Sequence, residues 1–315
     1  MFNYSSCQIS GTVIFIAGYS AILILGLFFN IAALYFFFRL PQLQSPTTVY
    51  MKNLAFSDLL LVCTLPLRIY DYTVSDPAGR GYSVPQWLCD AVGTLLLLNM
   101  YGSIFLLACI SLDRCLAVCF PLRSKRIRRW APWICVAVWC LNMGSSVMAY
   151  SISSNGFQKN TTNKQCFHGQ PPFVTMIGPT VGALVIGFLV PFIIMSVSSW
   201  TLLRAIGRSQ LVEIGLVNKE KIVRMLATNL AIFLVCFLPY HTVLVLYQLW
   251  KANHCLHEVY KITLLVACSN AVLDPLTYYF VAETLKKTLI KEIKLIGESD
   301  NSAEKMKGSV AHGSG

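Results

Sequence analysis

Seven long apolar stretches dominate the chain, at about residues 11–38, 47–71, 89–117, 131–153, 173–204, 221–247 and 259–281. A helix needs about 20 mainly apolar residues to cross roughly 30 Å of hydrocarbon, and each stretch is long enough to do so. Only 12% of the 315 residues are charged, whereas a soluble domain carries about 25%. The pattern therefore predicts an all-α membrane protein, folded as a bundle of seven transmembrane helices.

The connections between the stretches are short, so residues 1–295 are expected to form one domain and residues 296–315 a disordered tail. Residues 282–295 combine leucines with four lysines, which predicts a short amphipathic eighth helix on the inner leaflet. Residues 1–10 have no basic segment of the signal-peptide type, so the first apolar stretch is expected to act as its own insertion signal.

Basic residues are distributed unevenly between the two sides of the predicted bundle. The connections after the first, third and fifth stretches, together with the C-terminal segment, hold 19 of the 25 lysines and arginines. Because lysine and arginine accumulate on the cytoplasmic side, the C-terminus is predicted inside the cell and the N-terminus outside. The net charge of +11 then reflects orientation in the plasma membrane, and no nucleic acid partner is expected.

Two features of the predicted outer side agree with this orientation. Asn3 and Asn160 each begin an N-x-S/T glycosylation sequon. Four cysteines also fall on the outer side, which is an oxidising compartment where disulfides form: Cys7, Cys89, Cys166 and Cys255. Both features are expected in a protein of the cell surface.

Short motifs occur in order along the seven stretches. They are GLFFN at 26–30, NLAFSD at 53–58, SLDRC at 111–115, Trp139, Pro191, FLVCFLPY at 233–240 and NAVLDPLTY at 270–278. In this order the chain resembles the rhodopsin-like G-protein-coupled receptors over about residues 11–295. The resemblance implies a receptor that is not an enzyme and that has a heterotrimeric G-protein as partner, with arrestin and receptor kinases as further partners.

The resemblance also implies a disulfide between Cys89 and Cys166, which ties the second outer loop to the third helix. Cys7 and Cys255 are either a second bridge, between the N-terminal segment and the third outer loop, or two free thiols.

Six polar side chains lie deep inside the apolar stretches, where polar and ionisable groups are costly and mark functional sites. They are Asn30, Asp58, Asn99, Ser103, Asn270 and Asp274. The pairs Asn99–Ser103 and Asn270–Asp274 are spaced four residues apart and therefore share a helix face. By resemblance, Asp58 binds an allosteric sodium ion among these groups, and no other cofactor is expected. A hydrogen-bond network without an ion would explain the same residues.

By resemblance, Arg114 at the cytoplasmic end of the third stretch engages the G-protein, and Asp113 and Tyr278 belong to the same coupling region. Lys219 occupies the place of the usual acidic partner on the sixth helix, with Glu220 next to it, so Arg114 is expected to pair with its neighbour Asp113. The resemblance assigns a further activation switch to the sixth stretch: Phe233, Phe237 and Pro239.

Cations in the outer third of the bundle indicate the ligand class. The expected ligand-binding residues are Arg68, Tyr72, Tyr101, His241, Lys251 and Lys261. Cations at the mouth of an apolar pocket suit a ligand that has an anionic head and a hydrocarbon tail. The same cations could instead extend to lipid phosphates. The motifs look most like the lysophosphatidic acid and purinergic-like branch, which implies a lysophospholipid such as lysophosphatidic acid as agonist.

Other functions are compatible with parts of the same pattern. A nucleotide or a small carboxylate needs the same cations, so a receptor of the same fold for either ligand stays an alternative. An ion channel or transporter would also explain polar side chains inside the apolar stretches, and ion flux in liposomes would distinguish it.

Overall fold

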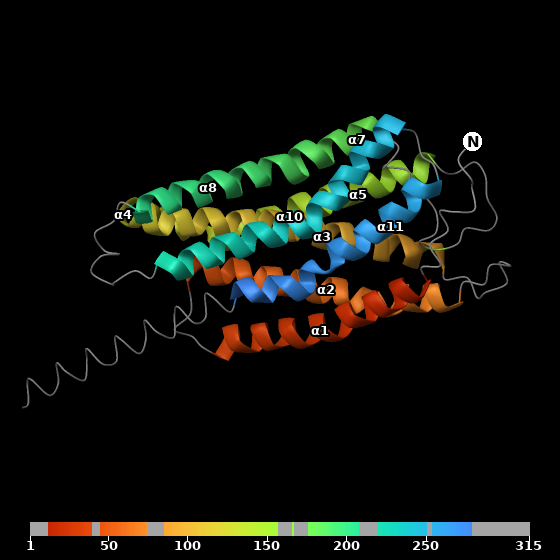
Figure 1. Ribbon diagram of the computed structural model, residues 1–315, viewed down its shortest axis with the longest axis horizontal. Helices are drawn as coiled ribbons and strands as arrows, with labels where there is room; N and C mark the ends of the chain where they lie inside the picture. The colour runs from red at the N-terminus through yellow and green to blue at the C-terminus, as the bar shows by residue number, and fades with distance from the viewer. Residues whose placement is uncertain are drawn as a thin grey trace, which may run out of the picture.

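The computed structural model describes residues 12–39, 45–74, 85–156, 166, 176–207, 219–250 and 254–278. Within these ranges, seven helical segments are long and apolar enough to cross a membrane. They run side by side along the long axis of the molecule (Figure 1). The prediction of an all-α bundle with seven spans is confirmed, and the predicted eighth helix at 282–295 lies outside the described residues.

The ends of each membrane-spanning helix lie close to the ends of one of the seven apolar stretches. The elements are α1 (Thr12–Arg39), α2 (Pro46–Val74), α3 (Gln86–Cys119), α4 (Pro121–Arg128), α5 (Ala131–Gly156), α7 (Ile177–Gly182), η3 (Ala183–Leu189), α8 (Val190–Gly207), α10 (Lys219–Trp250) and α11 (His254–Cys268). The α7, η3 and α8 segments follow one another directly and make the fifth span. After a turn at Ser269, helical residues 270–278 complete the seventh span.

Helix α3 is the central helix of the bundle. In its most apolar window 67% of the residues are buried, against 17% in that of α5. It contacts α2, α5, α8, α10 and α11. On the outer helices large apolar side chains face outward: Phe28 on α1 is 67% exposed and Leu141 on α5 is 72% exposed. Such an apolar exterior is stable in lipid and not in water.

Besides the seventh span with its turn at Ser269, three spans depart from a regular α-helix. Pro66 lies inside α2 and Pro239 inside α10, and each removes one backbone hydrogen bond of its helix. In the fifth span the π-helical η3 contains Gly187, and a Cβ atom there would lie 2.5 Å from Cε1 of Tyr101 on α3. Glycine at this position therefore allows Tyr101 to lie directly against the helix backbone.

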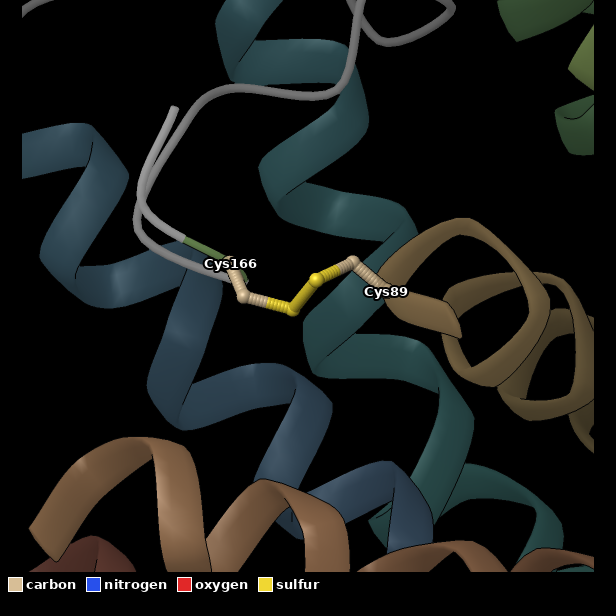
Figure 2. Close-up of a disulfide and its surroundings, with 2 residues drawn as sticks. All are labelled: Cys89 and Cys166. Atoms are coloured by element: carbon tan, nitrogen blue, oxygen red, sulfur yellow. A yellow bond between two sulfur atoms is a disulfide. The ribbon is translucent and has the colours of Figure 1, made fainter. Parts of the chain in front are cut away.

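A disulfide joins Cys89, near the beginning of α3, to Cys166 in the connection between α5 and α7 (Figure 2). Their Cα atoms are 5.6 Å apart, within the usual range for a bridge. The bridge that the resemblance implied is present. Cys255 is also disulfide-bonded, while Cys7 lies outside the described residues, so their mutual pairing stays a prediction.

Candidate functional site

Arg68 on α2 is a buried cation near one end of the bundle, two residues after Pro66. It is 5% exposed, and its Nη1 donates a hydrogen bond to the Tyr19 hydroxyl of α1 at 3.3 Å. Its guanidinium carbon lies 5.8 Å from the centroid of the Tyr19 ring. Arg68 therefore points into the bundle, and a side chain reaching out to lipid phosphates would not be buried in this way.

Aromatic rings form one wall around Arg68. Tyr72, one turn further along α2, stacks on Phe15 with ring centroids 4.9 Å apart and on Tyr19 at 6.0 Å. Asp71 is also buried and interacts electrostatically with Arg68. Sequence reasoning found Tyr72 but missed Tyr19 and Phe15, because nothing in an apolar first span marks which ring faces inward.

Lys261 on α11 contributes a second cation to the same region. Its Nζ lies 5.9 Å from the centroid of the Phe15 ring and 2.6 Å from Oε1 of Glu258, one turn earlier on α11. Both side chains are largely buried, at 12% and 13% exposure. An anion binding here would therefore compete with Glu258 for Lys261. The third expected cation, Lys251, lies outside the described residues.

Further into the bundle, a cluster of rings surrounds His241 on α10. Nδ1 of this buried histidine bonds to the carbonyl oxygen of Phe237 at 2.8 Å, so in the neutral ring Nδ1 is the donor and Nε2 the acceptor. Nε2 has no hydrogen-bond partner among the described residues. The ring of Phe188 stacks on His241 at 4.5 Å, and that of Tyr101 meets it edge-on at 5.9 Å. His241 thus offers an acceptor to a neutral donor group.

The same rings continue toward the middle of the bundle. Phe188 also stacks on Phe233 at 5.1 Å, and Phe233 meets Phe237 edge-on at 5.8 Å. Phe233 and Phe237 are fully buried, and Pro239 follows two residues after Phe237. A displacement of His241 or Phe188 can therefore reach Phe233 through direct ring contacts.

The six polar side chains expected inside the membrane do come together. Nδ2 of Asn99 donates to Oδ1 of Asp58 at 3.0 Å, and Nδ2 of Asn270 donates to Oδ2 of Asp274 at 3.4 Å. The two carboxyl groups interact electrostatically, and Ser103 lies beside Asp58. The sixth side chain, that of Asn30, joins α1 to the seventh span by donating to the carbonyl oxygen of Ala271 at 2.7 Å.

This cluster contains buried oxygens that make no hydrogen bond among the described residues, and four of them belong to amide carbonyl or carboxyl groups. Six buried oxygens have no hydrogen-bond partner among the described residues: Oδ1 of Asn30, Oδ2 of Asp58, Oγ of Ser103, Oδ1 of Asn270, Oδ1 of Asp274 and the Tyr278 hydroxyl. A buried carboxylate without a partner is costly, whereas hard cations prefer oxygen ligands. The donor set therefore fits a sodium ion, with Asp58, Ser103, Asn270 and Asp274 as the residues to hold it.

Asp113, in the SLDRC motif of α3, is paired with Arg128 of α4. Nε of Arg128 donates to Oδ1 at 2.7 Å and Nη2 to Oδ2 at 3.2 Å, while the Thr47 hydroxyl of α2 donates to Oδ2. The ion pair of Asp113 is thus with Arg128 and not with Arg114, although Asp113 still interacts electrostatically with Arg114. Adjacent residues on a helix point about 100° apart, so these two side chains do not face each other.

Arg114 itself lies at the end of the bundle that carries α4. Its Nε and Nη2 atoms are buried and have no hydrogen-bond partner among the described residues. Tyr278 is 4% exposed, and its ring meets Phe37 of α1 edge-on at 5.6 Å. Sequence reasoning missed one further contact here, in which Asn229 of α10 bonds to Ser111 of α3.

Three predicted surface sites lie outside the described residues. They are the two glycosylation sequons at Asn3 and Asn160 and the cysteine at position 7.

Residues 29–278 match the model of the family described as 7 transmembrane receptor (rhodopsin family). The chain belongs to this family. Lysophosphatidic acid receptor 6 of Mus musculus is 35% identical over 304 residues, which cover 92% of this chain and 87% of that receptor. Lysophosphatidic acid receptor 4 of Mus musculus is 38% identical over 287 residues, covering 86% and 75%. Lysophosphatidic acid receptor 5 of Mus musculus is 37% identical over 292 residues, again covering 86% and 75%.

A rhodopsin-family receptor is a multi-pass membrane protein that couples to heterotrimeric G-proteins. The family is non-enzymatic. Family membership also removes the ion channel and the transporter from consideration.

Proposed function

We propose that this receptor binds an extracellular lysophospholipid, with lysophosphatidic acid as the leading candidate, and transmits the signal to a heterotrimeric G-protein. The observation that carries the proposal is the buried Arg68, held among tyrosine rings inside a membrane-spanning segment. A buried guanidinium in lipid marks a functional site and suits a phosphate, which it can bind with two parallel hydrogen bonds. The relatives named as lysophosphatidic acid receptors support the same ligand class.

In this proposal the phosphate binds Arg68, Lys261 and Lys251, with Tyr72 beside Arg68. The phosphate replaces Glu258 as the partner of Lys261, which lies 2.6 Å from that carboxylate without ligand. The hydrocarbon tail extends inward along aliphatic and aromatic side chains toward Tyr101 and His241. Each buried methylene contributes about 0.8 kcal/mol, so tail length affects affinity directly.

The binding end is the extracellular end, in the plasma membrane. The excess of basic residues on the other side supports this orientation, since α4 alone carries four of them. The disulfide of Cys89 supports it too, because bridges persist in oxidising compartments. The proposed layout also includes glycosylation at Asn3 and Asn160 and a bridge between Cys7 and Cys255. Residues 1–295 form the single receptor domain, and residues 296–315 form a tail.

The residues of the polar cluster would hold a sodium ion in the resting state of the receptor, where the ion would supply a positive charge between the two carboxyl groups. Asp58 would supply the charge that binds the ion, and Ser103, Asn270 and Asp274 would supply further oxygens. Asn99 and Asn30 position the site through their hydrogen bonds to Asp58 and to Ala271. Ligand-driven rearrangement of Phe233 and Phe237 around Pro239 alters this cluster. The cytoplasmic half of α10 then moves away from α3, and Arg114, next to Asp113 in the chain, meets the G-protein. Tyr278 takes part in the same coupling step.

A G-protein activation screen on the purified receptor in lipid nanodiscs tests the ligand class. We expect lysophosphatidic acid to stimulate nucleotide exchange. Longer acyl chains should raise its potency stepwise until the apolar pocket is filled. Nucleotides and short carboxylates, the alternative ligands, would show no dependence on chain length. Stimulation by a nucleotide alone would overturn the lipid assignment and leave the receptor assignment intact.

A further inference from the structure

Asn229 on α10 makes a polar contact with α3 in an apolar part of the bundle. Its Nδ2 donates to the Ser111 hydroxyl at 2.6 Å and to the carbonyl oxygen of Leu107 at 3.3 Å. Asn229 is 3% exposed, Ser111 2% and Leu107 fully buried. The contact therefore joins the third and sixth spans directly, and its side chains are buried away from the surface of the bundle.

The neighbours of Asn229 along α10 make this amide unusual. The buried side chains on either side of it, Leu226 and Phe233 among them, are apolar and belong to the hydrophobic core. A leucine at 229 would continue that core, whereas an amide is costly in it unless it is hydrogen-bonded. Between membrane helices, asparagine side chains form hydrogen bonds that hold the helices together. The role of Asn229 thus lies in the bonds that it makes to α3.

The contact also lies close to the coupling arginine. Ser111 precedes Arg114 by three residues, which is about 4.5 Å along the helix axis. Lys219 stands in α10 where relatives in the wider family carry an acid to hold this arginine, so an ionic link from that position cannot form. The Asn229–Ser111 bond joins the same two helices one turn further into the membrane.

We propose that Asn229 is a positioning residue that holds the cytoplasmic half of α10 against α3 and thereby keeps the G-protein away from Arg114. This inference rests on the proposed function, in which α10 moves away from α3 on activation. The bond to Ser111 must break in that movement. Oδ1 of Asn229 has no hydrogen-bond partner among the described residues, so the amide is held from one side only and can be released.

A matched pair of variants isolates the hydroxyl of Ser111. Ser111→Thr and Ser111→Val add the same branched volume, but only threonine keeps a hydroxyl to accept the bond from Asn229. Relative to Ser111→Thr, we expect Ser111→Val to raise agonist-free nucleotide exchange about threefold to fifteenfold. This range is what losing one hydrogen bond between membrane helices allows. Asn229→Leu should give a similar rise, and combining it with Ser111→Val should add little more.

Two controls separate positioning from general destabilisation. Thr242→Val removes an exposed α10 hydroxyl that bonds only to Leu238 of the same helix, and should leave exchange unchanged. Exchange is expressed per folded receptor, since a merely structural role of Asn229 would lower the yield of folded receptor without raising its basal activity.

A second measurement needs no G-protein. Spin labels are carried by p-acetylphenylalanine at Arg126 of α4 and Ala227 of α10, both exposed. Ser111→Val should populate longer label-to-label distances than Ser111→Thr. Identical distance distributions in the two variants would overturn the inference. Longer distances without nucleotide exchange from any G-protein would uphold the link between the helices and overturn the proposed coupling instead.

Discussion

Arg128 on the short helix α4 holds the carboxylate of Asp113 with two hydrogen bonds, at 2.7 and 3.2 Å. Asp113 is 4% exposed and also accepts a hydrogen bond from Thr47, so α2, α3 and α4 meet at one buried charge. Arg128 makes these hydrogen bonds to Asp113, while the neighbouring Arg114 interacts with the same carboxylate electrostatically. The docking of α4 against α2 and α3 is thus a consequence of this ion pair.

Removing Arg128 should destabilise the receptor measurably. In Arg128→Ala the charge of Asp113 stays buried with Thr47 as its remaining side-chain partner, and losing a charged hydrogen bond costs about 1.5–3 kcal/mol. We expect the midpoint of thermal unfolding in nanodiscs to fall by several degrees. Arg129→Ala, which removes an exposed arginine of the same segment, is the control and should change the midpoint little. Equal losses in the two variants would show that the pair with Asp113 is unimportant.

Two glycines of the fifth span should respond oppositely to alanine. A Cβ atom at Gly187 would lie 2.5 Å from the ring of Tyr101, whereas one at Gly182 would have no neighbour within 4 Å. Gly187→Ala should therefore lower the free energy of unfolding by about 1–3 kcal/mol, and Gly182→Ala should raise it by up to about 1 kcal/mol. Calorimetry of both variants checks the difference in sign. Tyr101→Val should rescue Gly187→Ala, and a failure to rescue would place the strain elsewhere.

The seven spans could be predicted from the sequence because the bilayer imposes one length and one composition on every helix that crosses it. The deep polar side chains could also be found, because Asp58 and Asp274 stand out within apolar stretches. Spacing of four residues placed Asn270 and Asp274 on one face, and a hydrogen bond joins them in the structure.

Contacts between different helices could not be predicted in the same way, because they depend on the rotation of each helix about its axis. Sequence neighbours made Arg114 the obvious partner of Asp113, yet Arg128, fifteen residues away, takes that place. Asn229 belongs to none of the sequence motifs, and its bonds to Ser111 and Leu107 appear only in the structure. Tyr19 could not be told apart from the other aromatic residues of the first span.

Sodium should stabilise the receptor through Asp58. A ligand at ten times its dissociation constant adds about 1.4 kcal/mol to the free energy of unfolding. We therefore expect sodium chloride to raise the unfolding midpoint relative to N-methylglucamine chloride at constant ionic strength. Asp58→Asn should abolish this difference, whereas Asp90→Asn, at the outer end of α3, should retain it. A sodium effect that survives in Asp58→Asn would place the ion elsewhere.

Arg68 should contribute more to lysophosphatidic acid potency than its charge alone explains. Loss of one charged hydrogen-bonding partner weakens binding about tenfold to a hundredfold, which is the effect expected for Arg68→Ala. Arg68→Lys should lose less, because lysine keeps the charge but not the two-bonded geometry of the guanidinium. Tyr19→Phe removes only the hydroxyl at 3.3 Å from Nη1 and should change potency least. Nucleotide exchange titrated with lysophosphatidic acid ranks the three variants, and insensitivity to Arg68→Ala would remove the phosphate from this site.

Glu258 should oppose the binding of an anionic agonist. Its carboxylate lies 2.6 Å from Nζ of Lys261. A phosphate must therefore displace this carboxylate before it can form its own ion pair with the lysine. Glu258→Gln keeps the shape of the side chain and removes its charge. We therefore expect this variant to raise lysophosphatidic acid potency about threefold to tenfold, the reverse of the effect of Lys261→Ala. A monoacylglycerol, which has the same tail without a phosphate, provides the reference ligand. If Glu258→Gln changes the binding of both ligands equally, the carboxylate acts on the fold of α11 and not on the phosphate.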